Sequence, residues 1–187
     1  MSPSEDELPT RPNGGPPPLD PVASVRQHPT WFFTTGRFEW RTAVALLVTE
    51  AMYSPLVNST HVDRNDDWVA VSADADWLDG DLEAFAKPTV FPEGGTNATR
   101  AEVVLTAFCE AVFTASHGQR SDIRAVGGKS MPAPMVEALA NPELGRIVVF
   151  RVATDEPEVR TAMPRTTGRM AIALAELAEL ERRFQNA

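Results

Sequence analysis

Residues 147–152, Ile-Val-Val-Phe-Arg-Val, decide the fold class, because they form the clearest strand in the chain. A short run of β-branched and aromatic residues is typical of a strand, and its almost unbroken apolarity indicates burial on both faces. We therefore expect this segment to lie at the centre of a sheet. Residues 68–72, Trp-Val-Ala-Val-Ser, and residues 122–126, Asp-Ile-Arg-Ala-Val, predict two further strands.

Helical patterns alternate with these strands. Residues 39–52 repeat apolar side chains at helical spacing, and their Ala-rich composition favours a helix over the strand-like alternation that the same segment also shows. Thr99 and Glu102 have the spacing of a capping box, so a helix should begin there. Gly118 is placed to close that helix as a left-handed residue.

Two more helices are predicted towards the C-terminus. Residues 134–140 begin with a proline and end before Asn-Pro, which is typical of a short helix. Thr166 or Thr167 can cap a helix that runs to about residue 184. This last helix either packs on the domain's own sheet or pairs with a second copy in a homodimer, and the pattern leaves both open.

The alternation of strands and helices predicts an α/β or α+β domain, with a small mixed β-sheet of about three to five strands covered by helices. Residues 1–29 hold half of the 16 prolines and few large apolar side chains, so we expect a flexible, disordered Pro-rich tail there. Residues 30–187 then form a single globular domain, a length that suits one hydrophobic core.

Composition narrows the function classes. The net charge of -9 and the lack of a basic stripe argue against nucleic acid as a partner. No apolar run approaches the ~20 residues that a bilayer crossing needs, so no membrane is expected. The N-terminus lacks the pattern of a secretory signal, and one cysteine, Cys109, leaves no disulfide framework. We expect a soluble cytoplasmic protein, without a cofactor, and a buried, inert thiol at Cys109.

The segment between His61 and Ala86 is the strongest candidate for a site in the sequence. It carries eight acidic residues against a single basic one, Arg64. The eight are Asp63, Asp66, Asp67, Asp74, Asp76, Asp79, Asp81 and Glu83. Such a cluster repels itself unless a cation, a basic partner or water compensates the charge.

Two functions from different classes explain this cluster. The favoured one is a non-catalytic interaction or regulatory protein that presents an acidic, Trp-containing surface to a basic partner, since aromatic side chains anchor interfaces. Its binding residues would be Trp68, Trp77, Asp66, Asp67, Asp79 and Asp81. The alternative is a small enzyme acting on a small polar substrate, with a carboxylate–histidine pocket that can use a divalent metal. Its catalytic residues would be His61, Asp63, Asp74 and Asp76.

A second, smaller candidate follows the predicted strand at 122–126. Gly127, Gly128 and Lys129 could hold an anion through backbone amides. The nucleotide-binding phosphate loop is excluded, because position 123 is Ile instead of the required glycine and prolines stand where a helix should begin. The sequence therefore does not decide whether the protein is an enzyme.

Overall fold

The computed structural model describes residues 20–94, 98–125, 130–152 and 166–167. The helices, in chain order, are α1 (Pro21–Gln27), η1 (Pro29–Trp31), α2 (Trp40–Tyr53), η2 (Glu83–Phe85), η3 (Pro92–Gly94), α3 (Glu102–Phe108) and α4 (Ala133–Leu139), the η elements being single 3-10 turns. The strands are β1 (Ser59–Asn65), β2 (Trp68–Ala73), β3 (Ala111–Ser116), β4 (Gln119–Ala125), β5 (Arg146–Arg151) and the two-residue β6 (Thr166–Thr167).

The strands form one sheet in the order β4-β3-β5-β2-β1-β6, and each pairing between them is antiparallel. The α+β form of the predicted fold is therefore confirmed, while the parallel pairing implied by a mixed sheet does not occur among the described strands. The hairpin β1–β2 and the hairpin β3–β4 lie on opposite sides of β5. The segment joining these hairpins carries α3.

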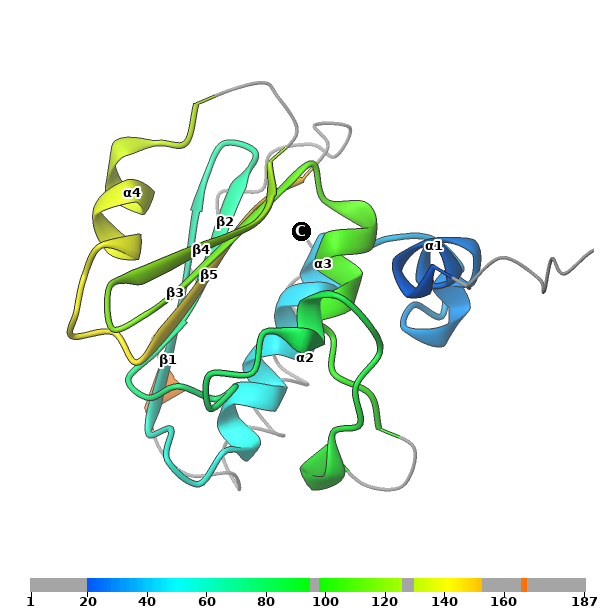
Figure 1. Cartoon of the computed structure of the whole chain (residues 1–187), viewed down its shortest axis with the longest axis horizontal. Helices are drawn as coiled ribbons and strands as arrows, with labels where there is room; N and C mark the ends of the chain where they lie inside the picture. Colours follow the sequence, from blue (N-terminus) through cyan, green and yellow to red (C-terminus); the bar gives the residue numbers. More distant parts are fainter. Residues whose placement is uncertain (1–19, 95–97, 126–129, 153–165, 168–187) are drawn as a thin grey trace, which may run out of the picture.

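Strand β5 is central and buried on both faces, as its apolar sequence predicts. Val148 and Phe150 pack into the larger core, whereas Ile147 and Val149 pack into a smaller one. Helices α2 and α3 cover the face of the larger core, and α4 covers the other face (Figure 1). Apolar side chains on successive residues are needed because both faces of the strand are covered.

The helix expected from residue 99 is much shorter than predicted. Helix α3 starts at Glu102 and ends at Phe108, and Ala101, rather than Thr99, occupies the N-cap position without a side-chain hydrogen bond. Strand β3 follows at once. Gly118 does adopt a positive φ of 77°, but with His117 at 49° it forms the two-residue turn of the β3–β4 hairpin. Five of the six residues of β3 are buried, with Val112 in the larger core and Ala111, Phe113 and Ala115 in the smaller one. Burial of successive residues on both faces resembles a helical repeat over a few residues.

Both chain ends differ from the predictions where the structure describes them. The composition predicts a tail through residue 29, yet α1 forms within it, begins with Asp20 accepting a hydrogen bond from the Val22 amide, and buries Val25 completely. Thr166 and Thr167 pair with β1 in a strand instead of capping a helix. Residues 1–19 and 168–187, which hold the rest of the tail and of the predicted C-terminal helix, lie outside the described residues.

Within the described ranges, the helices are too short and too polar for any of them to cross a bilayer.

Candidate functional site

The β1–β2 hairpin divides the acidic segment into two groups. Asp63, Asp66 and Asp67 lie on β1 and in its turn, whereas the carboxylates from Asp74 onward follow the far end of β2. Strand β2 spans six residues, which is about 20 Å at a rise of about 3.3 Å per residue. The eight acidic residues therefore do not form one patch.

Along β1, His61 lies opposite Ser72 and Asp63 lies opposite Ala70; both point to the same side of the strand, and the Nε2 of His61 lies 2.9 Å from the Asp63 carboxylate. Asp66 is exposed in the turn, where its carbonyl accepts a hydrogen bond from the Arg64 guanidinium. Asp67 is buried, and its carbonyl accepts a hydrogen bond from the Val152 amide. Strand β1 and its turn consequently offer two exposed carboxylates, Asp63 and Asp66, and Asp63 is already paired with His61.

At the second end, Asp74 holds the chain entering β1. One carboxylate oxygen accepts hydrogen bonds from the backbone amides of Asn58, at 2.9 Å, and Ser59, at 3.2 Å. Partial burial would raise the pKa of Asp74, but these amide hydrogen bonds favour the charged form and the pKa is lowered. Asp74 therefore has a structural role as a charged acceptor.

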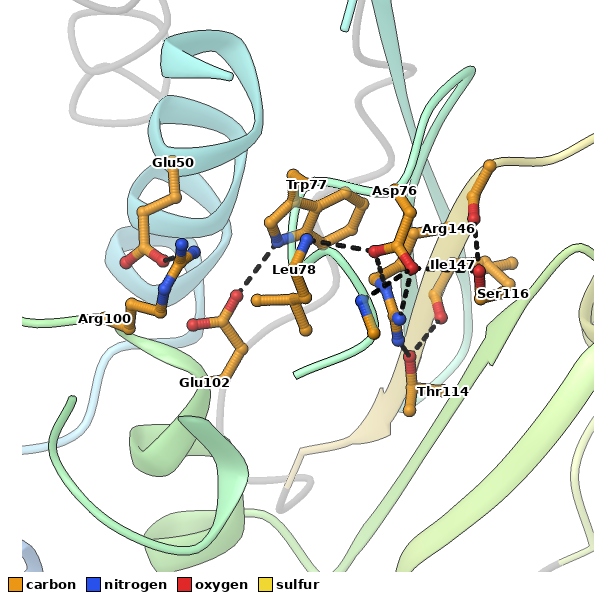
Figure 2. Close-up of polar contacts among 12 residues, drawn as sticks. Glu50, Asp76, Trp77, Leu78, Arg100, Glu102, Thr114, Ser116, Arg146 and Ile147 are labelled. Carbon is orange, nitrogen blue, oxygen red and sulfur yellow. Dashed lines mark hydrogen bonds and ion pairs between the residues drawn. The ribbon is translucent and has the colours of Figure 1, made fainter. Parts of the chain in front are cut away.

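Asp76 is the anchor of the loop that follows (Figure 2). Its carboxylate pairs with the guanidinium of Arg146 through two N–H groups, one of them at 2.6 Å, and accepts the Ser116 hydroxyl at 2.9 Å. It also accepts the backbone amides of Leu78 and Gly80. Burial would raise the pKa of Asp76, but the hydrogen bonds and the charge of Arg146 outweigh it and the pKa is lowered.

Close backbone contact makes this ion pair possible. The amide of Gly145 donates to the Ala73 carbonyl at 3.0 Å, and a Cβ at residue 145 would lie 2.1 Å from the Cα of Ala75. The missing side chain lets the loop lie directly against the start of β5. Arg146, whose side chain is 2% exposed, can then reach Asp76.

The two tryptophans of the acidic segment are buried, so the prediction that they belong to an exposed contact surface is wrong. Trp68 is 3% exposed and stacks on Phe113 beneath α4. Trp77 is 4% exposed, lies in the larger core, and donates its indole N–H to Glu102 at 2.9 Å (Figure 2). Their apolar rings stabilise the core, which leaves only the carboxylates for a partner.

A cluster of three charged residues that the sequence did not identify as a site lies close to Trp77 (Figure 2). Its members are Glu50, Arg100 and Glu102. Glu50 of α2 is 4% exposed and accepts the Ala101 amide at 2.6 Å. The guanidinium of Arg100 lies 3.8 Å from the other oxygen of Glu50 (Figure 2). Burial raises the pKa of Glu50 well above its ordinary value, and repulsion from the nearby Glu102 carboxyl adds to the shift.

The sequence gives little signal for this cluster. Glu50 stands in an amphipathic helix where a glutamate is usually solvated, and Glu102 has the spacing of a capping residue. Their burial depends on how α2, α3 and the Trp77 loop pack together. No pattern within the sequence of one helix or one loop can predict how these three segments pack together.

The structure brings together only two of the residues predicted for an enzyme, because His61 pairs with Asp63. Asp74 binds backbone amides and Asp76 binds Arg146. Among the described residues, no group of three or more His, Cys, Asp or Glu side chains is arranged to hold a metal ion. The predicted anion site at 127–129 lies outside the described residues, so it stays a prediction.

No protein-family model, no curated protein and no solved structure matches this chain. Its function must therefore be argued from the residues themselves.

Proposed function

We propose that this is a non-catalytic interaction or regulatory protein that presents the acidic loop, residues 74–83, to a basic partner. The observation that carries the proposal is the exposure of Asp79, Asp81 and Glu83 within five positions of the chain. Within the described part of the chain, only Glu83 among these three has an ion-pair partner, the exposed Lys87 at 2.7 Å. Closely spaced carboxylates of this kind attract Lys and Arg side chains and speed encounter with a basic surface.

The anchoring of the loop supports the same proposal. Asp76 and Trp77 hold it from the inside through Arg146 and Glu102, while the neighbouring carboxylates face solvent. Asp79 has a positive φ of 49° and Gly80 one of 78°, so the backbone turns tightly between the anchored and the exposed residues. A loop that is already ordered loses less conformational entropy when a partner binds.

An enzyme is not proposed, because no described geometry brings His61, Asp63, Asp74 and Asp76 together around a substrate. The homodimer through the C-terminal helix stays a prediction, since residues 168–187 lie outside the described part of the chain. The acidic composition and the single cysteine support a cytoplasmic setting for the proposed interaction.

The test uses a lysine-rich peptide as the basic probe. The wild-type protein should bind it more weakly at about 150 mM salt than at about 20 mM salt, because surface electrostatics are screened. The triple variant Asp79→Asn/Asp81→Asn/Glu83→Gln should lose most of this binding. A control variant with the same change in charge, Asp63→Asn/Asp66→Asn/Glu137→Gln, should retain it. Equal losses in both variants, or binding that does not respond to salt, would contradict the proposal.

A further inference from the structure

Helix α2 has a face that carries no charge and lies outside both cores of the described structure. We name this face the outer stripe; its residues follow helical spacing and are Thr42, Ala45, Leu46, Thr49 and Tyr53. Ala45 and Leu46 are also absent from the partly buried side chains that pack against the described cores. The two charged residues of α2 lie elsewhere, since Glu50 is buried and Arg41 lies over the Trp40 ring. The solvent-facing side of a helix is usually rich in charged side chains, so the outer stripe is typical of a covered surface.

Both threonine hydroxyls of the outer stripe are already hydrogen-bonded. The Thr42 hydroxyl donates to the Glu39 carboxylate at 3.0 Å. The Thr49 hydroxyl donates to the Ala45 carbonyl at 2.7 Å. Covering these two residues would therefore leave no hydroxyl donor without an acceptor, which is the main cost of burying such a group. Apolar side chains can pack on them.

A cavity of about 590 Å³ lies along the same side of α2. Leu46, Thr49 and Tyr53 of the outer stripe line it, and Glu50 borders it as well. Trp31 of η1 lines it from outside α2 and is 58% exposed, so a large aromatic ring remains open at its edge. The other lining residues are mostly apolar. The cavity is therefore a hollow in which large apolar side chains of a covering segment would be removed from water.

The chain leaves the sheet in the direction of this face. Strand β6 pairs antiparallel with the start of β1, where Thr167 lies opposite Ser59 (Figure 1). Because the two strands run in opposite directions, the chain leaves β6 towards residue 58 and the end of α2 at Tyr53. Residue 168 thus starts near the C-terminal end of the outer stripe.

The sequence after β6 has the pattern of an amphipathic helix, although residues 168–187 lie outside the described part of the chain. Its apolar residues recur at intervals of three and four and are Met170, Ala173, Leu177, Leu180 and Phe184. Glu176, Glu179 and Arg183 take the opposite side of such a helix. A helix of about 20 residues is about 30 Å long, and the 14 residues of α2 span about 21 Å. The segment is therefore long enough to cover the whole stripe.

We propose that residues 168–187 form a helix that packs on the outer stripe of α2 within the same chain, antiparallel to α2, with its apolar side chains over the cavity. This interaction is separate from the acidic loop and goes beyond the function proposed above. Packing within one chain is favoured over a homodimer, because the segment starts beside the face that it covers and so has a high effective concentration there.

The first experiment measures how fast a maleimide labels the full chain with Ala45→Cys on the outer stripe. Cys109 is 1% exposed and adds little to the signal. The Ala45→Cys variant should react at least about tenfold more slowly than Glu137→Cys, which replaces an exposed residue of α4, because labelling requires the covering helix to open. Equal rates in the two variants would overturn the proposal.

A matched pair of charges tests which segment covers the stripe. In the Ala45→Cys background, Leu177→Asp places a charge on the apolar side of the predicted helix and should raise the labelling rate at least about tenfold. Ala175→Asp adds the same charge on the opposite side and should leave the rate unchanged. An unchanged rate with Leu177→Asp, or equal effects of both substitutions, would contradict the proposal.

The wild-type protein gives a test that does not depend on the folding of a variant. Hydrogen exchange should show protected amides over residues 174–184, and this protection should be the same when the protein is diluted, because packing within one chain does not depend on concentration. Protection that is lost on dilution would overturn the proposal in favour of a second copy. Unprotected amides over these residues would overturn the helix itself.

Discussion

The indole Nε1 of Trp77 donates a hydrogen bond of 2.9 Å to Oε1 of Glu102, a carboxyl side chain without exposed surface. The two residues are 25 positions apart in the chain. This contact joins the acidic loop to the start of α3, and Glu102 in turn lies close enough to Glu50 to raise its pKa, after burial has made the larger contribution. A buried acceptor that loses its donor is costly, so this bond should be visible in stability measurements.

Trp77→Phe should lower the free energy of unfolding by about 1–3 kcal/mol more than Trp68→Phe does. Both changes remove a similar volume from buried positions, but the Trp68 Nε1 has no hydrogen-bond partner within the described residues. The difference between the variants therefore isolates the bond to Glu102. Urea denaturation followed by circular dichroism measures it, and equal losses would contradict the assigned role of Trp77.

Asp76→Asn should destabilise the protein by about 3–5 kcal/mol, because it leaves the buried guanidinium of Arg146 without a charged partner. The loss in the double variant Asp76→Asn/Arg146→Met should be smaller than the sum of the two single losses. Asp122→Asn breaks the exposed pair with Arg120 and should cost less than about 1 kcal/mol. Additive losses at Asp76 and Arg146 would show that the two side chains do not act as a pair.

Ionisation of Glu50 should contribute measurably to the pH dependence of the free energy of unfolding. Burial and the Glu102 carboxyl raise the pKa of Glu50, so the folded protein holds this proton more tightly than the unfolded chain does. The stabilisation from this tighter proton binding is fully present below the ordinary pKa of 4.5 and is lost as the pH rises through the folded-state pKa. Glu50→Gln should therefore show a smaller loss of stability between mildly acidic and alkaline pH. Asp76, whose pKa is lowered, has the opposite sign, and its contribution is lost on acidification below 3.8. Parallel pH–stability curves for wild type and Glu50→Gln would be the contrary result.

Gly145→Ala should destabilise the fold by about 3 kcal/mol or more, because the new methyl group would overlap the backbone at Ala75 and separate Arg146 from Asp76. Gly80→Ala is the matched control, since no atom lies within 4 Å of the place its methyl group would take and only the positive φ opposes the change. That strain costs about 1–2 kcal/mol. Thermal denaturation should place Gly145→Ala clearly below Gly80→Ala, and the reverse order would refute the close contact.

Cys109 should resist thiol reagents in the folded protein. The side chain is 1% exposed, and burial raises the pKa of the thiol well above its ordinary value, so little thiolate forms at neutral pH. Reaction with Ellman's reagent should begin only as the protein unfolds in urea. Rapid labelling under native conditions would instead indicate that α3 opens readily.

Local patterns correctly predicted the elements whose own residues determine them. The helix over 39–52, the strand over 68–72, the short helix at 134–140 and the central strand all occur within a few residues of their expected bounds. In each of them the composition, the residues at the ends or an apolar run favours one kind of structure over the other. The prediction was wrong where two kinds of structure share a pattern, as in the segment after Phe108, where a strand buried on both faces imitates a helix.

The candidate site could not be predicted in the same way. The sequence located the acidic residues but could not show that Asp76 binds Arg146, 70 positions away, or that the two tryptophans are buried while Asp79 and Asp81 are exposed. Burial of a charge is decided by whether a distant partner can compensate it. The sequence by itself thus determined the central strand and the charge of the loop. Only the tertiary structure decided which carboxylates stabilise the fold, which face solvent, and that Glu50 borders a cavity.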